Sequence, residues 1–171
     1  MIDKTTARAA SEVARVAALE RMAILDTGEE KAYDDITRMA ASICGTPIAL
    51  ISLTDRHRQW FKSRVGMQMT EAPRESSFCA HALETPTHPF VVRDASKDYR
   101  FKANPLVTND PNIRFYAGAP LVTSTGQALG VVCVLDSEPR DITLAQMEQL
   151  QFLAQQVITL MESRSTGLTA D

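Results

Sequence analysis

Two apolar runs separated by a short turn constrain the fold of this chain more than any other feature. Residues 114–122 (RFYAGAPLV) and 127–135 (QALGVVCVL) are rich in branched and aromatic side chains, and the turn between them contains Ser124, Thr125 and Gly126. Runs of this length bounded by turn residues are typical of buried strands. The pattern therefore predicts two strands joined by a tight turn, and a sheet to which they belong.

Three further runs extend this sheet. Residues 47–53 (PIALISL) are short and apolar, residues 59–65 (QWFKSRV) alternate, and a third run lies at 90–93. With the first two runs they predict five strands, mostly paired as hairpins. We interpret residues 66–75 as a loop. The polar segment 96–111 is interpreted as a partly helical crossover, because long segments of this kind are usually lids or binding loops.

Helices are predicted before and after the strands. Apolar residues recur three or four positions apart at residues 5–25, 33–43, 76–84 and from 143 to about 164. Thr27 with Glu30, and Thr143 with Gln146, have the spacing of a capping box, in which two side chains satisfy the free amides of a helix start. We therefore expect an N-terminal helix at residues 1–18, a domain at 19–164 that includes the last helix, and a flexible tail at 165–171.

The last helix carries an apolar seam. Its members follow a 3-4-3-4 spacing over two heptads: Met147, Leu150, Ala154, Val157 and Met161. Other apolar residues widen the surface, so one face could pack on the sheet while another meets a partner helix. We expect the chain to form a homodimer through this seam.

Composition restricts the class of protein. At 171 residues the chain fits one domain, and 18 Lys plus Arg against 21 Asp plus Glu give a net charge of −3, without the basic excess of a nucleic-acid surface. The three cysteines have no paired metal or disulfide spacing. No signal peptide and no membrane-length apolar run is present. We expect a cytoplasmic protein without nucleic-acid or membrane partners.

Several stretches, in their order, resemble one known family. They are ILDTGEE (24–30), ISLTD (51–55), WFKSRVG (60–66), SFCAHAL (77–83), VVRDASKDYRFKANPLV (91–107), IRFYAGAPLV (113–122) and LGVVCVLD (129–136). Together they resemble a GAF domain, of the branch found in front of bacterial histidine kinases and cyclic-dinucleotide enzymes. The resemblance implies an α+β, PAS-like fold. Its antiparallel sheet of five to six strands has terminal helices on one face, and lid helices and loops over a pocket on the other.

The resemblance also implies a function and a partner. Members of the family bind cyclic nucleotides, tetrapyrroles, haem or small metabolites in the pocket, and dimers usually form through the terminal helices. We therefore expect a non-catalytic sensory domain of bacterial signal transduction that binds an unknown small molecule. No cofactor can be named, and we expect any signalling effector to be a separate protein.

The candidate ligand-binding residues come from the short helix, the crossover and the strand that follows it. They are Phe78, Cys79, Ala82, Asp94, Phe101, Leu106, Arg114, Tyr116 and Gly118. Arg114 and Tyr116 could orient an anionic or aromatic ligand. Alternatively, Arg114 forms an ion pair with a lid carboxylate, and Asp94 caps a turn.

Cys79 is a candidate for several kinds of chemistry. At i, i+2 on a helix, Cys79 and His81 point about 200° apart, so a metal site is disfavoured. Free methionine-(R)-sulfoxide reductase shares the fold, but its attacking cysteine has no counterpart in residues 109–113, and Cys44 and Cys133 lie in apolar stretches that make thiols inert. A bilin-attaching Cys-His pair and the NKFDE pattern of cyclic-nucleotide binders are also missing. The alternatives left open are a ligand-free dimerisation module and a redox sensor that uses Cys79.

Overall fold

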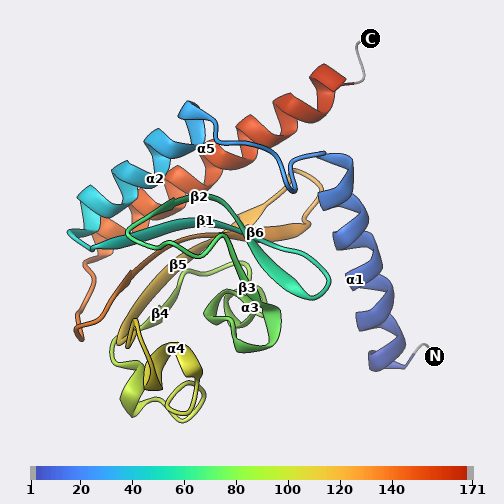
Figure 1. Cartoon of the computed structure of the whole chain (residues 1–171). Coiled ribbons are helices and arrows are strands. Elements are labelled where there is room, and N and C mark those ends of the chain that lie inside the picture. The colour runs from blue at the N-terminus through green and yellow to red at the C-terminus, as the bar shows by residue number, and fades with distance from the viewer. Residues whose placement is uncertain (1–2, 169–171) are drawn as a thin grey trace.

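A six-stranded antiparallel sheet forms the centre of the structure, a computed structural model that describes residues 3–168 (Figure 1). The strands are β1 (Ile48–Thr54), β2 (Arg58–Val65), β3 (Glu71–Pro73), β4 (Phe90–Val92), β5 (Phe115–Val122) and β6 (Ala128–Asp136). Their order across the sheet is β3-β2-β1-β6-β5-β4, and every neighbouring pair is antiparallel. The α+β fold with this sheet confirms the expected fold class.

The predicted strands all form, with a sixth added at one edge. β5 and β6 pair along their whole length, with Gly118 opposite Cys133. β6 and β1 are buried at every position, as expected for strands covered on both faces. The added strand is β3, which lies within the segment interpreted as a loop. Three residues that end in a proline give no alternation to detect, and a proline cannot donate a ladder hydrogen bond, which suits it to an edge strand such as β3.

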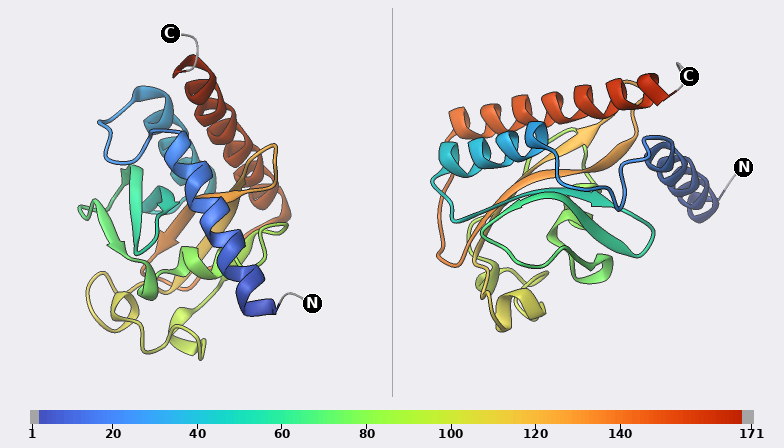
Figure 2. Two further views of the ribbon diagram at one scale, coloured as in Figure 1. Left: turned by 90° about the vertical axis from the view of Figure 1, so that its right-hand side faces the viewer. Right: turned by 45° about the horizontal axis from the view of Figure 1, so that its top comes forward.

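Three of the five α-helices cover one face of the sheet, and the two short ones lie on the other. The α-helices are α1 (Lys4–Arg21), α2 (Lys31–Cys44), α3 (Phe78–Ala82), α4 (Pro105–Thr108) and α5 (Leu144–Leu168), with 3-10 turns η1 (Arg74–Ser76) and η2 (Ala95–Lys97). α2 and α5 lie side by side on this face, and α1 crosses one end of it (Figure 2). The larger core cluster lies between them and includes Leu19, Ile51 and Leu150, each fully buried.

The opposite face carries the short α3 and the crossover, called the lid here and defined as residues 93–114. A second buried cluster lies beneath them and includes Leu50, Phe61, Phe78, Phe101 and Tyr116. Alternation explains the division, because Leu50 and Ile51 are neighbours in β1 and belong to opposite clusters. The sheet therefore separates a helix-side core from a lid-side core.

The two predicted capping boxes have different outcomes. At the start of α5, the Thr143 amide donates to Gln146 Oε1 at 3.0 Å and the Gln146 amide donates to Thr143 Oγ1 at 3.1 Å, which confirms that box. The box at Thr27 does not form. α2 begins at Lys31, the Thr27 hydroxyl donates to the Ile24 carbonyl, and the Glu30 carboxylate forms ion pairs instead of capping the helix.

The apolar seam of α5 packs against the chain's own sheet. Leu150, Ala154, Val157 and Met161 are at most 4% exposed within the helix-side core, and Met147 is partly buried. A face of this kind has the same spacing whether it meets a sheet or a partner helix, so the spacing could not separate the two. The prediction that these five residues form the dimer surface is corrected here, because the helix-side core already buries four of them.

The ends of the first and last helices also differ from the prediction. α1 ends at Arg21 rather than residue 25, because Ala23 and Asp26 adopt positive φ angles that no α-helix accommodates. α5 continues to Leu168, four residues beyond the predicted end at Arg164. The rest of the predicted tail, residues 169–171, and residues 1–2 of the predicted N-terminal helix lie outside the described residues. Within residues 3–168, no helix has the length and apolar character of a membrane span.

Candidate functional site

A small cavity lies between the lid-side face of the sheet and the elements that cover it. We call it the lid-side pocket. The sheet contributes Leu50, Gln59, Phe61, Tyr116, Cys133 and Leu135, the α3 region contributes Ser77, Phe78 and Cys79, and the remaining wall is Met67, Met69, Ala72 and Leu106. Its volume is about 30 Å³, which is enough for a molecule of about the size of water. None of these lining residues carries a charged side chain.

Aromatic stacking fills the space beside this cavity. The Phe78 ring stacks between Phe101 and Tyr116, with centroid distances of 4.4 Å and 5.2 Å. His81 meets Phe101 edge-on at 4.8 Å, and the Arg100 guanidinium lies over Phe101 at 5.2 Å. Phe78 is 2% exposed and Phe101 is 1% exposed, so the stack joins α3 and the lid to the sheet.

Four of the nine predicted residues line the pocket: Phe78, Cys79, Leu106 and Tyr116. Ala82 and Phe101 are buried next to it, in the same cluster but outside the cavity wall. Gly118 lies beneath it, where an added Cβ would be 2.6 Å from Val131 Cγ1 and 2.7 Å from the Tyr116 hydroxyl. Glycine is needed at position 118 because the Tyr116 side chain occupies that space.

The two charged candidates point elsewhere. The Arg114 guanidinium donates to the carbonyls of Val107 and Ile113 at 2.9 Å and 3.1 Å, so it holds the lid rather than facing the pocket. The Asp94 carboxylate accepts from the Ser96 amide at 3.1 Å and caps η2. The capping alternative for Asp94 is therefore confirmed, whereas Arg114 binds backbone carbonyls instead of the expected carboxylate.

Gln59 is a lining residue that the sequence interpretation missed. Its amide oxygen accepts from the hydroxyls of Ser52 and Thr54, each at 2.9 Å. Its amide nitrogen is buried and has no hydrogen-bond partner among the described residues. Alternation along β2 places Gln59 on the same face as Phe61, and this was the signal available in the sequence. One end of the amide is thus held firmly while the other end remains free in a buried wall.

Cys133 is the second missed residue, and it forms a pair with Cys79. The two sulfurs are 4.0 Å apart, and the Tyr116 hydroxyl donates to Cys79 Sγ at 3.2 Å. Hydrogen bonding with Cys133, and then with Tyr116, lowers the pKa of the Cys79 thiol from 9.0 to about 7 despite its burial. Burial raises the pKa of Cys133 well above its usual value. Of the two thiols, Cys79 is therefore the one that ionises more readily.

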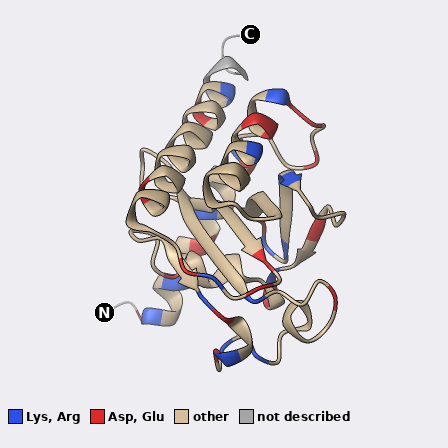
Figure 3. Ribbon diagram, turned by 90° about the vertical axis from the view of Figure 1, so that its left-hand side faces the viewer, with Lys and Arg blue, Asp and Glu red and all other residues tan. Residues whose placement is uncertain are grey.

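The charged residues lie on the helices, loops and strand ends (Figure 3). One exception is Lys62 on the helix side of β2, whose side chain is 0% exposed and donates to Gly28 O at 2.7 Å and Glu30 at 2.5 Å. The hydrogen bond from Lys62 lowers the pKa of Glu30, which also pairs with Arg164 of α5 at 3.2 Å. The described residues contain no cluster of three or more His, Cys, Asp or Glu that could hold a metal ion.

Comparison with known proteins identifies the family to which this fold belongs. The family model described as GAF domain matches residues 2–160. A cyclic di-GMP phosphodiesterase of Pseudomonas aeruginosa is 45% identical over 129 residues, which are 75% of this chain and 22% of that protein. The chain therefore spans about a fifth of the length of this relative.

Two solved structures show the same fold at low sequence identity. The GAF domain of an Acinetobacter phosphoenolpyruvate-protein phosphotransferase superposes with a TM-score of 0.64 at 16% identity, covering 91% of this chain and 97% of that chain. The second GAF domain of DevS from Mycobacterium smegmatis gives 0.60 at 13% identity, covering 82% and 97%.

The expectation that the protein is not an enzyme is wrong by this comparison. The curated relative is named as an enzyme, a phosphodiesterase. That expectation was based on finding no catalytic motif in these 171 residues. The lack of a recognisable motif in one stretch does not decide the activity of a protein, since function resides in sites that a fold alone does not specify.

Proposed function

The chain belongs to the GAF domain family, a sensory fold of signal transduction, and on that premise we propose that it binds a small neutral molecule in the lid-side pocket and thereby regulates the turnover of cyclic di-GMP. The observation that carries the proposal is the free amide end of Gln59 in a wall without charged side chains. A buried polar group without a partner costs about 1–3 kcal/mol, which a ligand's hydrogen bond would offset.

The wall chemistry favours a neutral ligand. An ion buried there would lose its hydration without gaining a counter-charge, which costs several kcal/mol. The Arg114 guanidinium could supply a counter-charge only by giving up its hydrogen bonds to the lid carbonyls. Cyclic di-GMP carries two phosphates, so in this proposal it is the signal whose turnover is regulated and not the occupant of this pocket.

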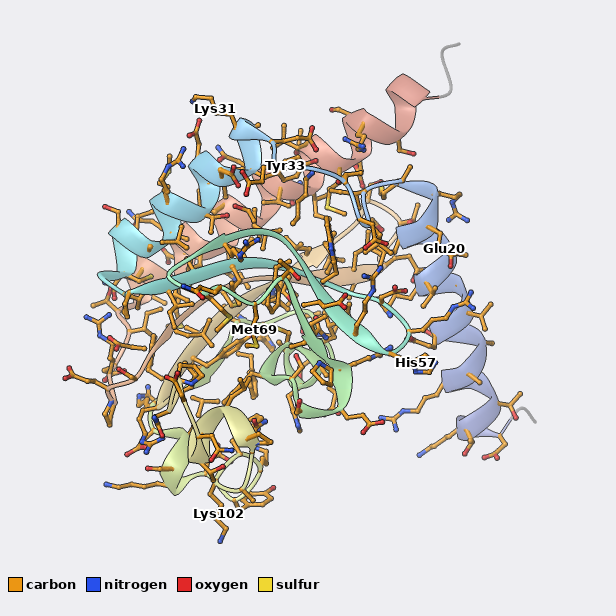
Figure 4. The ribbon with its side chains drawn as sticks, viewed as in Figure 1. Glu20, Lys31, Tyr33, His57, Met69 and Lys102 are labelled. Carbon is orange, nitrogen blue, oxygen red and sulfur yellow. The ribbon has the colours of Figure 1, made fainter. Side chains whose placement is uncertain are left out.

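A ligand larger than water must widen the pocket. Met67 and Met69 form part of its wall, and Met69 is 39% exposed on the loop between β2 and β3 (Figure 4). Methionine side chains are unbranched and change rotamer easily. We propose that these two side chains move aside and admit the ligand between Phe61 and Leu106, while Phe78 and Phe101 stay in place.

The relative supports the link to cyclic di-GMP, since a protein 45% identical over this region is named for hydrolysing that nucleotide. Strand β5 also connects the pocket with the helix-side core. Tyr116 and Ala117 are neighbours in β5 that face the pocket and the helix-side core respectively. A ligand that displaces Tyr116 therefore changes the surface on which α5 packs.

We also propose a homodimer, but through the outer face of α5. Phe152 is 63% exposed at the centre of that face, opposite the buried seam. An exposed phenylalanine among polar neighbours provides a contact point for a second copy. Equilibrium sedimentation at micromolar concentration tests this, and a Phe152→Glu variant should be monomeric.

The ligand-free dimerisation module is the second candidate function. The observation in its favour is the small free volume of about 30 Å³, because stacked aromatic rings already fill most of the region under the lid. The two candidates differ in one respect that can be measured, which is whether any small molecule binds saturably.

Matched probe pairs separate the candidates. Nicotinamide and nicotinate, and uracil and orotate, are similar in ring shape but differ in charge. We expect a saturable rise in melting temperature with the neutral member of a pair and none with its anion. Gln59→Leu should abolish the rise, whereas Val13→Ala, at a position on α1 that is 70% exposed, should preserve it. Equal responses to neutral and charged members would contradict the neutral pocket, and no response to any member would favour the dimerisation module.

The cyclic di-GMP part needs a separate test. The cyclic di-GMP content of cells that produce the chain can be measured by mass spectrometry and compared with cells that lack it. We expect the content to change, and Gln59→Leu to alter it while Val13→Ala does not. Identical content in all four strains would overturn this part of the proposal.

A further inference from the structure

Two thiols, a phenol and a free amide meet in the lid-side pocket, and the ligand proposal uses only the amide. Cys79 and Cys133 are 5% and 0% exposed, and their sulfurs are 4.0 Å apart on two elements that pack together, α3 and β6. The third cysteine, Cys44, lies in the helix-side core with neither thiol near it. The sequence separates Cys79 and Cys133 by more than fifty positions, so the fold creates this pair.

We propose that the lid-side pocket is a hydrogen peroxide site, in which peroxide oxidises Cys79 and Cys133 to a disulfide. Peroxide is a neutral molecule of two oxygens that donates and accepts hydrogen bonds. It matches both the volume of about 30 Å³ and the uncharged wall. This inference goes beyond the regulation of cyclic di-GMP turnover and needs no other ligand.

The surroundings of Cys79 make it the attacking thiol. The Tyr116 hydroxyl donates to its sulfur at 3.2 Å, and the amide of Cys79 is held by the Ser77 hydroxyl at 3.0 Å. A thiolate is the nucleophile in peroxide reduction, and a hydrogen bond donated to sulfur stabilises it. The free end of the Gln59 amide lies in the same wall and offers a hydrogen bond to a peroxide oxygen.

The reaction balances with peroxide as the only oxidant. The Cys79 thiolate attacks one oxygen, the O–O bond breaks, and hydroxide leaves with the proton that Cys79 had released, so that water and a sulfenic acid form. The Cys133 sulfur then attacks Cys79 Sγ, the S–O bond breaks, and the departing hydroxide takes the Cys133 proton as a second water. The two thiols lose two electrons and two protons, and peroxide accepts both.

The resulting bond would change the pocket. The sulfurs must approach from 4.0 Å to about 2.05 Å. Cys79 then no longer accepts the hydrogen bond from Tyr116 as a thiolate, and α3 is tied covalently to β6. Oxidation therefore couples the pocket wall to the centre of the sheet.

Peptide mapping of the reduced protein after treatment with hydrogen peroxide tests the proposal. We expect a loss of about 2 Da, one reactive thiol left at Cys44, and a peptide in which Cys79 and Cys133 are linked. Cys133→Ser should trap Cys79 as a sulfenic acid, with a gain of about 16 Da, whereas Cys79→Ser should leave Cys133 unmodified. Cys44→Ser is the matched control, a buried cysteine whose loss should leave the linkage intact.

Tyr116→Phe tests the positioning role of the phenol. We expect oxidation at neutral pH to slow about fivefold and the rate profile to shift to higher pH by about one unit, since loss of the donated hydrogen bond lowers the thiolate fraction at neutral pH. Melting curves establish that each variant is folded, and Cys79→Ala replaces Cys79→Ser if the latter is not. The proposal is overturned if all three thiols survive peroxide that oxidises free N-acetylcysteine, or if oxidation occurs without the Cys79–Cys133 linkage.

Discussion

Truncation of Phe78 to alanine is the change that most directly tests the lid-side core. The side chain is 2% exposed and stacks on Phe101 at 4.4 Å and on Tyr116 at 5.2 Å. Removal of a buried phenylalanine ring costs about 3–5 kcal/mol, which includes the burial lost and the cavity left behind. For a domain of this size, each kcal/mol lowers the melting temperature by about 2–4 °C. We therefore expect Phe78→Ala to melt about 6–20 °C below the parent protein.

Urea unfolding followed by circular dichroism measures the free energy directly, with a shift in midpoint at unchanged slope as the expected result. The matched control is Tyr99→Ala, because Tyr99 is 84% exposed and its loss should stay within about 0.5 kcal/mol. The enlarged apolar cavity should also bind benzene, and benzene should restore part of the lost stability. A loss below about 1 kcal/mol for Phe78→Ala would refute the claim that the ring joins α3 and the lid to the sheet.

Three further predictions concern single residues. Gly118→Ala should cost about 1–3 kcal/mol in urea unfolding, because its Cβ would lie 2.6 Å from Val131 Cγ1; an unchanged midpoint would contradict the crowding. Glu30→Gln should cost about 3 kcal/mol because it leaves the buried Lys62 ammonium without its carboxylate, and adding Lys62→Met should recover part of this; additive losses would show that the pair is not coupled. Hydrogen bonding and ion pairing with Arg15, and also with Arg74, lower the pKa of Glu12 to about 2, so the stabilisation from this pairing is present above pH 4.5 and is lost as the pH falls toward 2. The melting temperature of Glu12→Gln should therefore depend less on pH between 4.5 and 2 than that of the parent protein. The same pH dependence in both proteins would contradict the pairing.

The central strands were predictable because their pattern is local. β5 and β6 are short apolar runs around a turn, and their length and their branched and aromatic side chains favour strands over helices. The edge strand β3 has three residues and was invisible to such a test. The start of α2 was misplaced for a different reason. Glu30 has the spacing of a cap, but the buried Lys62 on a distant strand attracts its carboxylate more strongly.

The site was only half predictable, because its members depend on which strands are neighbours. Phe78, Cys79 and Tyr116 belong to motifs visible in the sequence. Cys133 and Gln59 reach the pocket through strand pairing and alternation on β6 and β2, which a single sequence does not specify. The same limit applies to α5, whose apolar face could be assigned to a partner or to the chain's own sheet only after the sheet was placed.

Methyl NMR of the methionines tests the central claim that the lid-side pocket is the ligand site. Met67 and Met69 line the pocket, while Met39 on α2 is 49% exposed on the helix side and serves as an internal reference. During titration with the neutral probes, we expect saturable shifts of the Met67 and Met69 methyl signals and none at Met39. The anionic counterparts should shift no signal. Saturable shifts confined to Met39, or equal shifts with neutral and anionic probes, would contradict the account.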